Sequence, residues 1–133
     1  MTPHRWPLRV YYEDVDLAGI VYYANYLRFV ERARSEMIRE VGIDQAAMRR
    51  DGSVFAVRRV EADYLRPARY DDELVVETAL ADVMGARFML DQTVLRDGER
   101  LFAARVQIVC IGLDGRPRRL PDAITRMAVL SSP

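Results

Sequence analysis

Residues 11–41 read YYEDVDLAGIVYYANYLRFVERARSEMIREV, and this stretch decides the fold because the spacing of its apolar residues changes within it. Over residues 25–41 apolar side chains recur every three or four positions with charged residues between them, which is typical of an amphipathic α-helix. Asn25 is of a type preferred at a helix N-cap, and Gly42 stands where a helix commonly ends. The predicted buried face consists of Tyr26, Leu27, Val30, Ala33, Met37, Ile38 and Val41.

The sequence on both sides of this helix predicts strands. A short strand-like run precedes the helix, and a second, shorter helix follows it before four longer strand-like runs. Two of these runs meet at Asp97-Gly98, a strong hairpin signal. The expected strands are residues 8–12, 55–65, 74–83, 88–96 and 101–113, and the expected minor helices are residues 44–50 and 123–130. The pattern predicts an α+β chain in one domain, residues 1–133, whose antiparallel sheet wraps around the long helix. Such a small half-open unit commonly dimerises.

Composition excludes several classes of partner and chemistry. Twenty basic residues balance twenty acidic ones, so no overall field draws nucleic acid or an anionic membrane surface. All the basic residues are arginines, which excludes Schiff-base chemistry and lysine-dependent phosphate loops. The sequence has no apolar run long enough for a signal peptide or a membrane span, so we expect no membrane insertion and a cytoplasmic location.

Histidine and cysteine each occur once, as His4 and Cys110. We therefore expect no metal site built from these residues and no internal disulfide. His4 lies where chains usually fray, so no imidazole is available for a Ser-His-Asp or Cys-His arrangement unless His4 is held in place. If the protein hydrolyses a substrate, we expect a carboxylate to do the chemistry.

Two carboxylates, Asp14 and Asp16, lie in a predicted loop just before the long helix. Gly19 allows close approach of the backbone, and the N–H groups at the helix start carry partial positive charge. A carboxylate on one side of a carbonyl and amide donors on the other are typical of an acyl-transfer site. The alternative is a surface turn in which the aspartates bond the nearby backbone.

Residues 11–36 resemble the signature of hot-dog-fold acyl-CoA thioesterases, in the branch of YbgC-like and 4-hydroxybenzoyl-CoA thioesterase-like proteins. The similarity continues through YLRPARYDDE, residues 64–73, and RRLP, residues 118–121. The resemblance implies a hot-dog fold, with a five-stranded antiparallel sheet around one long central helix. It also implies active sites between the subunits of a homodimer or homotetramer.

The resemblance implies roles for individual residues. Asp16 matches the catalytic aspartate, acting as nucleophile or general base, and Asp14 is assigned to loop structure. The backbone N–H of Tyr23 matches the group that polarises the thioester carbonyl, and Gly19 matches the glycine that opens space for it. The positions matching recurrent pocket or capping residues are Tyr22, Asn25 and Tyr26.

The substrate implied by the resemblance is an acyl-CoA, whose phosphates suit arginine. Arg58 and Arg59 are candidates for phosphate binding, although a solvated strand edge is the alternative interpretation. Many YbgC-like members carry histidine where this chain has Tyr23, so the acyl group stays open. Two other functions also stay open: hydrolysis of acyl groups held on acyl carrier protein, and non-catalytic binding of an acyl ligand.

Overall fold

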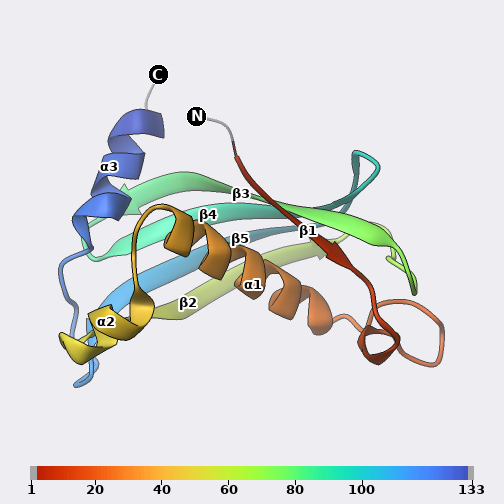
Figure 1. The fold of residues 1–133 in the computed structure, drawn as a ribbon, viewed down its shortest axis with the longest axis horizontal. Coiled ribbons are helices and arrows are strands. Elements are labelled where there is room, and N and C mark those ends of the chain that lie inside the picture. Colours follow the sequence, from red (N-terminus) through yellow and green to blue (C-terminus); the bar gives the residue numbers. More distant parts are fainter. Residues whose placement is uncertain (1–2, 132–133) are drawn as a thin grey trace.

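The computed structural model describes residues 3–131, and its main body is one antiparallel sheet that curves around one long helix (Figure 1). The elements in chain order are β1 (His4–Arg9), a 3-10 turn η1 (Tyr12–Asp14), α1 (Asn25–Glu40), α2 (Gln45–Arg50), β2 (Ser53–Tyr64), β3 (Glu73–Met84), β4 (Arg87–Arg96), β5 (Glu99–Gly112) and α3 (Asp122–Ser131). The predicted α+β hot-dog architecture is confirmed.

The sheet has the strand order β1-β3-β4-β5-β2, with every neighbouring pair antiparallel. The predicted hairpin at Asp97-Gly98 joins β4 to β5, and both turn residues have positive φ, 50° and 79°. β1 and β2 are the two edge strands of the sheet. From Val57 to the end of β2 every side chain is exposed, on both faces.

Helix α1 buries one face against the concave side of the sheet, as its sequence period predicts. Tyr26, Phe29 and Val30 fill the core beside the even-numbered residues of β5, which run from Phe102 to Cys110. Leu27, expected inside, is 40% exposed because the buried face is rotated toward Phe29.

Arg34 is a charged residue on the buried face of α1. It is only 9% exposed, and its guanidinium donates to Gln92 Oε1 at 3.0 Å. The side-chain amide of Gln92 in turn donates hydrogen bonds from Nε2 to Val30 O and Thr78 Oγ1. Burial lowers the pKa of Arg34, and the negative charge of Glu31 opposes that shift.

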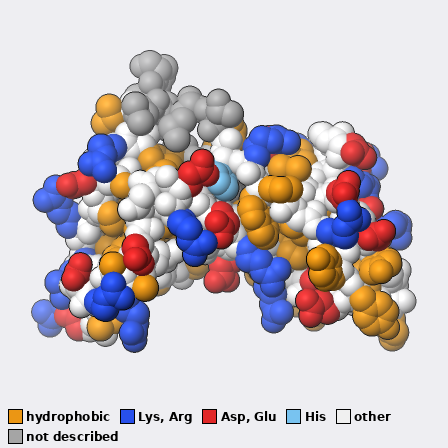
Figure 2. All heavy atoms as spheres, viewed as in Figure 1, with side chains coloured by type: hydrophobic (Ala, Val, Ile, Leu, Met, Phe, Trp, Pro, Cys, Tyr) orange, Lys and Arg blue, Asp and Glu red, His pale blue; other side chains and the backbone are white. Residues whose placement is uncertain are grey.

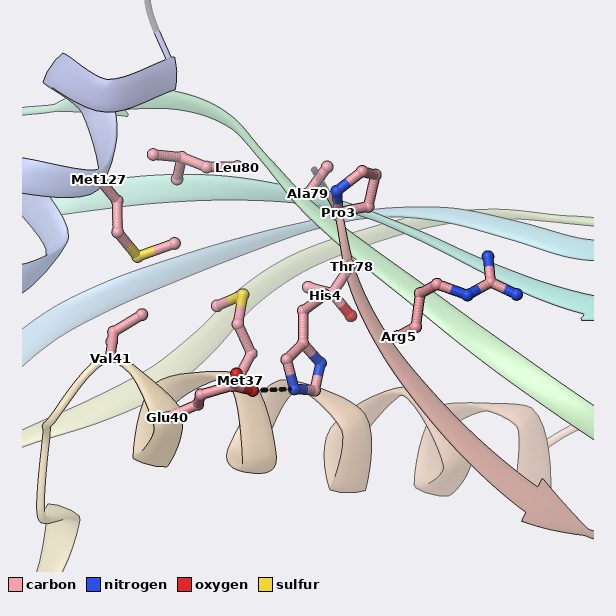
Figure 3. A pocket seen from close by; sticks show the side chains of 10 residues that line it. All are labelled: Pro3, His4, Arg5, Met37, Glu40, Val41, Thr78, Ala79, Leu80 and Met127. Atoms are coloured by element: carbon pink, nitrogen blue, oxygen red, sulfur yellow. Dashed lines mark ion pairs between the residues drawn. The ribbon is translucent and has the colours of Figure 1, made fainter. Parts of the chain in front are cut away.

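The first strand begins earlier than expected, and His4 is not frayed. Residues 8–12 are predicted as a strand, but pairing with β3 runs from His4 to Arg9 because Trp6 and Leu8 alternate inward there. His4 pairs with Thr78 in the sheet, and its Nε2 lies 2.8 Å from Glu40 Oε2. Figure 3 shows this contact beside the last turn of α1, in a recess of about 560 Å³. His4 thus lies at the opposite end of α1 from Asp16.

No helix within residues 3–131 is both long and apolar enough to span a bilayer.

Candidate active site

Residues 14–22 form a small hairpin that leads directly into α1. Tyr22 N donates to Asp14 O at 2.9 Å, Val15 bridges Val21, and Asp16 N donates to Ile20 O at 3.0 Å. Gly19, with φ of 77°, donates back to Asp16 O at 3.0 Å and closes the turn. This ladder places Asp16 on the first arm of the hairpin, opposite Ile20 and beside the turn.

The two oxygens of the Asp16 carboxylate lie in different environments. Oδ1 accepts a hydrogen bond from Ala18 N at 2.8 Å, which is the local turn that the alternative interpretation predicts. For Oδ2, no donor is recorded among residues 3–131, and the residue is exposed in the single subunit. One oxygen therefore holds the side chain in place while the other stays accessible for chemistry.

Asp14 has a structural role, because its hydrogen bonds hold the hairpin together. Its Oδ2 accepts from Tyr11 N at 2.8 Å, and its carbonyl accepts from Asn25 Nδ2 at 2.9 Å as well as from Tyr22. The sequence predicts Asn25 as the N-cap, but Asn25 is the first helical residue and Ala24 takes the cap position without a side-chain bond. The prediction of Asn25 as N-cap is wrong, because its amide reaches back to the loop instead.

The start of α1 presents unbonded amide groups. Tyr22 O accepts from Asn25 N at 2.8 Å, but no acceptor is recorded for Tyr23 N or Ala24 N within the described chain. The first N–H groups of a helix lack intrahelical partners and carry partial positive charge. These amides can therefore bind a negatively charged oxygen close to the hairpin.

Residues 67–72, far from the hairpin in sequence, help to hold it in place. Val21 N donates to Ala68 O at 2.8 Å, and Ala68 N donates to the Tyr26 hydroxyl at 2.9 Å. Arg96, on β4, holds the same segment through Asp72 at 2.7 Å and Pro67 O at 3.3 Å. The YLRPARYDDE motif thus acts on the hairpin structurally, whereas the sequence offers no signal for Arg96.

The aromatic residues around the helix entry divide into buried and exposed ones. Tyr26 is 3% exposed, stacks on Phe102 with ring centroids 5.0 Å apart, and has its pKa raised by burial. Tyr22 and Tyr23 are exposed and contact each other, with centroids 4.9 Å apart. Figure 2 shows hydrophobic side chains gathered at this end of the molecule. The exposed rings of Tyr22 and Tyr23 thus lie at the entry to α1, directly after the hairpin in the chain.

Arg58 and Arg59 line a second recess, on the side of the sheet away from α1. Register brings them beside Arg87 of β4 and Arg105 of β5 in a cavity of about 370 Å³. Arg59 pairs with Glu61 at 2.8 Å and Arg105 with Asp91, which leaves Arg58 and Arg87 without a recorded ion pair among the described residues. Sequence reasoning missed Arg87 and Arg105, because only the strand register joins them to Arg58. Asp16 does not line this recess.

Comparison with known proteins gives consistent matches. The family model described as Thioesterase-like superfamily matches residues 10–127. The acyl-CoA thioester hydrolase YbgC of Escherichia coli is 40% identical over 125 residues, or 92% of this chain and 93% of that protein. A 1,4-dihydroxy-2-naphthoyl-CoA hydrolase of Thermosynechococcus vestitus is 30% identical over 92% of this chain and 87% of that protein. The crystal structure of a probable thioesterase from Bartonella henselae has a TM-score of 0.85 at 39% identity, covering 90% of this chain and 99% of that one.

Proposed function

We infer that this chain, which belongs to the thioesterase-like superfamily, is a thioester hydrolase that converts an acyl-CoA to the free acid and coenzyme A. The observation that carries the site assignment is the hairpin of residues 14–22, which combines a free Asp16 oxygen with unbonded amides at the start of α1. A thioester has a good leaving group, so a carboxylate and an oxyanion donor suffice without histidine or metal.

Asp16 acts in one of two ways. As nucleophile, its carboxylate adds to the thioester carbonyl and the C–S bond breaks, giving a mixed anhydride and the thiolate of coenzyme A. Water then hydrolyses the anhydride and supplies the proton for the thiolate. As general base, Asp16 removes a proton from water while that water attacks the carbonyl directly, and the proton passes to the leaving thiolate. The free Oδ2 serves either route.

The backbone N–H of Tyr23 binds the carbonyl oxygen as negative charge develops on it. Support comes from the missing acceptor for this amide within residues 3–131 and from its place at the positive end of a 16-residue helix. Gly19 leaves room above the loop, since nothing lies within 4 Å of the position a Cβ would take. The exposed ring of Tyr22 contacts the acyl group, and Asn25 and Tyr26 hold the pocket in shape.

The working unit is a homodimer or homotetramer in which β2 pairs with β2 of a second copy. β2 is an edge strand of twelve residues, and its last eight are exposed on both faces. A long, open edge with apolar residues such as Val57 and Val60 is a ready template for pairing. In the single subunit Asp16 faces solvent, so a second copy supplies the wall that the reaction needs.

The phosphates of coenzyme A bind in the recess of Arg58, Arg59, Arg87 and Arg105. Support comes from four guanidinium groups against a single acidic lining residue, Glu61, and from the preference of arginine for phosphate oxygens. The substrate reaches the enzyme in the cytoplasm, which agrees with the unpaired, buried Cys110.

The test is steady-state hydrolysis of butyryl-CoA, octanoyl-CoA and benzoyl-CoA, with thiol release followed by a chromogenic disulfide. We expect turnover of at least one of them. A panel with no turnover above the uncatalysed rate, on coenzyme A or on carrier protein, contradicts the enzyme and favours a non-catalytic acyl-binding module. Faster hydrolysis of the same acyl group on acyl carrier protein favours the carrier-protein thioesterase.

A further inference from the structure

Tyr64 is the last residue of β2, and its ring is held among three other aromatic rings. The ring centroid lies 5.1 Å from that of Phe102, 5.6 Å from Tyr26 and 6.1 Å from Tyr23, all in edge-to-face geometry. Such contacts fix the ring plane and therefore the direction of the hydroxyl. Burial and the neighbouring Tyr23 both raise the pKa of this phenol, so the hydroxyl keeps its proton.

The Tyr64 hydroxyl donates a hydrogen bond of 3.0 Å to the carbonyl oxygen of Tyr23. Within the described residues no backbone N–H is recorded on that oxygen, since Leu27 N bonds Ala24 O instead. Among the described residues, the Tyr64 hydroxyl is therefore the hydrogen-bond donor to the Tyr23 carbonyl. Tyr22 differs, because both its N–H and its carbonyl have backbone partners, Asp14 O and Asn25 N.

We propose that Tyr64 is a positioning residue for the reaction, whose hydroxyl orients the Tyr23–Ala24 peptide at the oxyanion site. The inference rests on the proposed function, because it concerns the same site. In a trans peptide the C=O and N–H point in opposite directions, so holding Tyr23 O toward β2 aims Ala24 N–H away from β2. Accepting a hydrogen bond at the carbonyl also polarises the N–H of the same peptide.

Two adjacent amides then act on the substrate. Tyr23 N–H belongs to the peptide whose carbonyl bonds Asn25 N, and Ala24 N–H belongs to the peptide whose carbonyl bonds Tyr64. Neither amide has a recorded acceptor of its own in residues 3–131. The two N–H groups are thus preorganised by different anchors, and only the Tyr64 anchor depends on a side chain that can be replaced without altering the loop sequence.

The experiment compares Tyr64→Phe with Tyr70→Phe. Tyr64→Phe removes the hydroxyl and keeps the ring contacts, while Tyr70 is 58% exposed and no partner is recorded for its hydroxyl in the described chain. With the fastest substrate among butyryl-, octanoyl- and benzoyl-CoA, we expect Tyr64→Phe to lower kcat about ten-fold with KM within two-fold of wild type, and Tyr70→Phe to match wild type. Thermal unfolding midpoints should stay within about 2 °C of wild type, because the Tyr64 residue is half exposed.

A wild-type kcat in Tyr64→Phe overturns the positioning role. A raised KM with unchanged kcat overturns it too, since it assigns the hydroxyl to ground-state substrate contact. Infrared spectra of benzoyl-CoA labelled with ¹³C at the thioester carbonyl, bound to Asp16→Asn, test the role without turnover. Adding Tyr64→Phe should shift the carbonyl stretch back toward its value in water, and an unchanged stretch overturns the inference. Failure of wild type to hydrolyse any acyl-CoA overturns the proposed function instead, so the two failures are distinguishable.

Discussion

The side-chain amide of Asn25 donates a 2.9 Å hydrogen bond to the backbone carbonyl of Asp14, eleven residues earlier in the chain. This bond ties the first residue of α1 to the base of the hairpin that carries Asp16. The distance between the carboxylate and the helix amides is therefore set by the fold rather than by a free loop. A reaction that needs both groups at one carbonyl depends on that rigidity.

Gly19→Ala should slow catalysis more than its stability cost explains. Gly19 has φ of 77°, and a Cβ there meets nothing within 4 Å, so the penalty is conformational, about 1 kcal/mol. Gly42→Ala is the matched control, with φ of 96°, an equally open position and a place at the far end of α1. We expect similar losses of unfolding free energy by urea titration, but a loss of kcat/KM of ten-fold or more, roughly, only in Gly19→Ala. Equal activities of the two variants would contradict the role of Gly19.

Arg58→Ala should weaken binding of the nucleotide part of the substrate. Loss of one phosphate-binding guanidinium is expected to raise KM for an acyl-CoA about ten-fold while leaving kcat unchanged. The same acyl group on pantetheine, which lacks the nucleotide, should show no difference between the variant and wild type. Arg126→Ala, on α3 and outside the recess, serves as the charge-matched control. An equal KM effect on the pantetheine thioester would contradict phosphate binding at Arg58.

Negative charges placed on the edge strand β2 should dissociate the oligomer. Val57 and Val60 are 48% and 38% exposed on β2, and two aspartates there repel their counterparts in a second copy. We expect Val57→Asp/Val60→Asp to sediment as a monomer of about 15 kDa with little activity. Leu113→Asp, at an exposed apolar residue just after β5, should leave the oligomer intact. An unchanged oligomer in the double variant would exclude β2 as the interface.

The buried polar cluster under α1 should show strong coupling between its members. Gln92→Leu leaves the buried guanidinium of Arg34 without its recorded hydrogen-bond partner, and we expect a loss of about 2–4 kcal/mol of unfolding free energy. Adding Arg34→Met removes the unpaired charge, so the double variant should be more stable than the sum of the two single losses predicts. Chemical denaturation of all three variants measures the coupling. Strict additivity would show that the two side chains act independently.

Much of the fold follows from local patterns, and the errors arise where tertiary contacts override them. The period of residues 25–41 predicts α1 correctly, and Asp97-Gly98 predicts its hairpin, because both depend on near neighbours in the chain. The first strand is misplaced because its position depends on the partner β3. The hydrogen bond from the buried Arg34 to Gln92 spans 58 residues, so no local pattern predicts it.

The sequence predicts only part of the candidate site. The resemblance over residues 11–36 predicts the loop that carries Asp16 and Gly19, and the structure adds the hydrogen bonds that hold it. Tyr64 stands within the YLRPARYDDE motif, but its bond to Tyr23 O spans 41 residues and has no local signature. Arg87 and Arg105 join Arg58 only through strand register.

The central claim is that the Asp16 carboxylate performs the hydrolysis, and Asp16→Asn tests it most directly. The amide oxygen of asparagine can still accept from Ala18 N, so the turn and the unfolding midpoint should be preserved. Asp14→Asn is the paired control, because within residues 3–131 the hydrogen bond of the Asp14 carboxylate is the one that Oδ2 accepts from Tyr11 N. In steady-state hydrolysis of the fastest acyl-CoA, we predict that kcat of Asp16→Asn falls by roughly a thousand-fold or more while Asp14→Asn stays within about three-fold of wild type. A folded Asp16→Asn enzyme with the kcat of wild type would contradict the account.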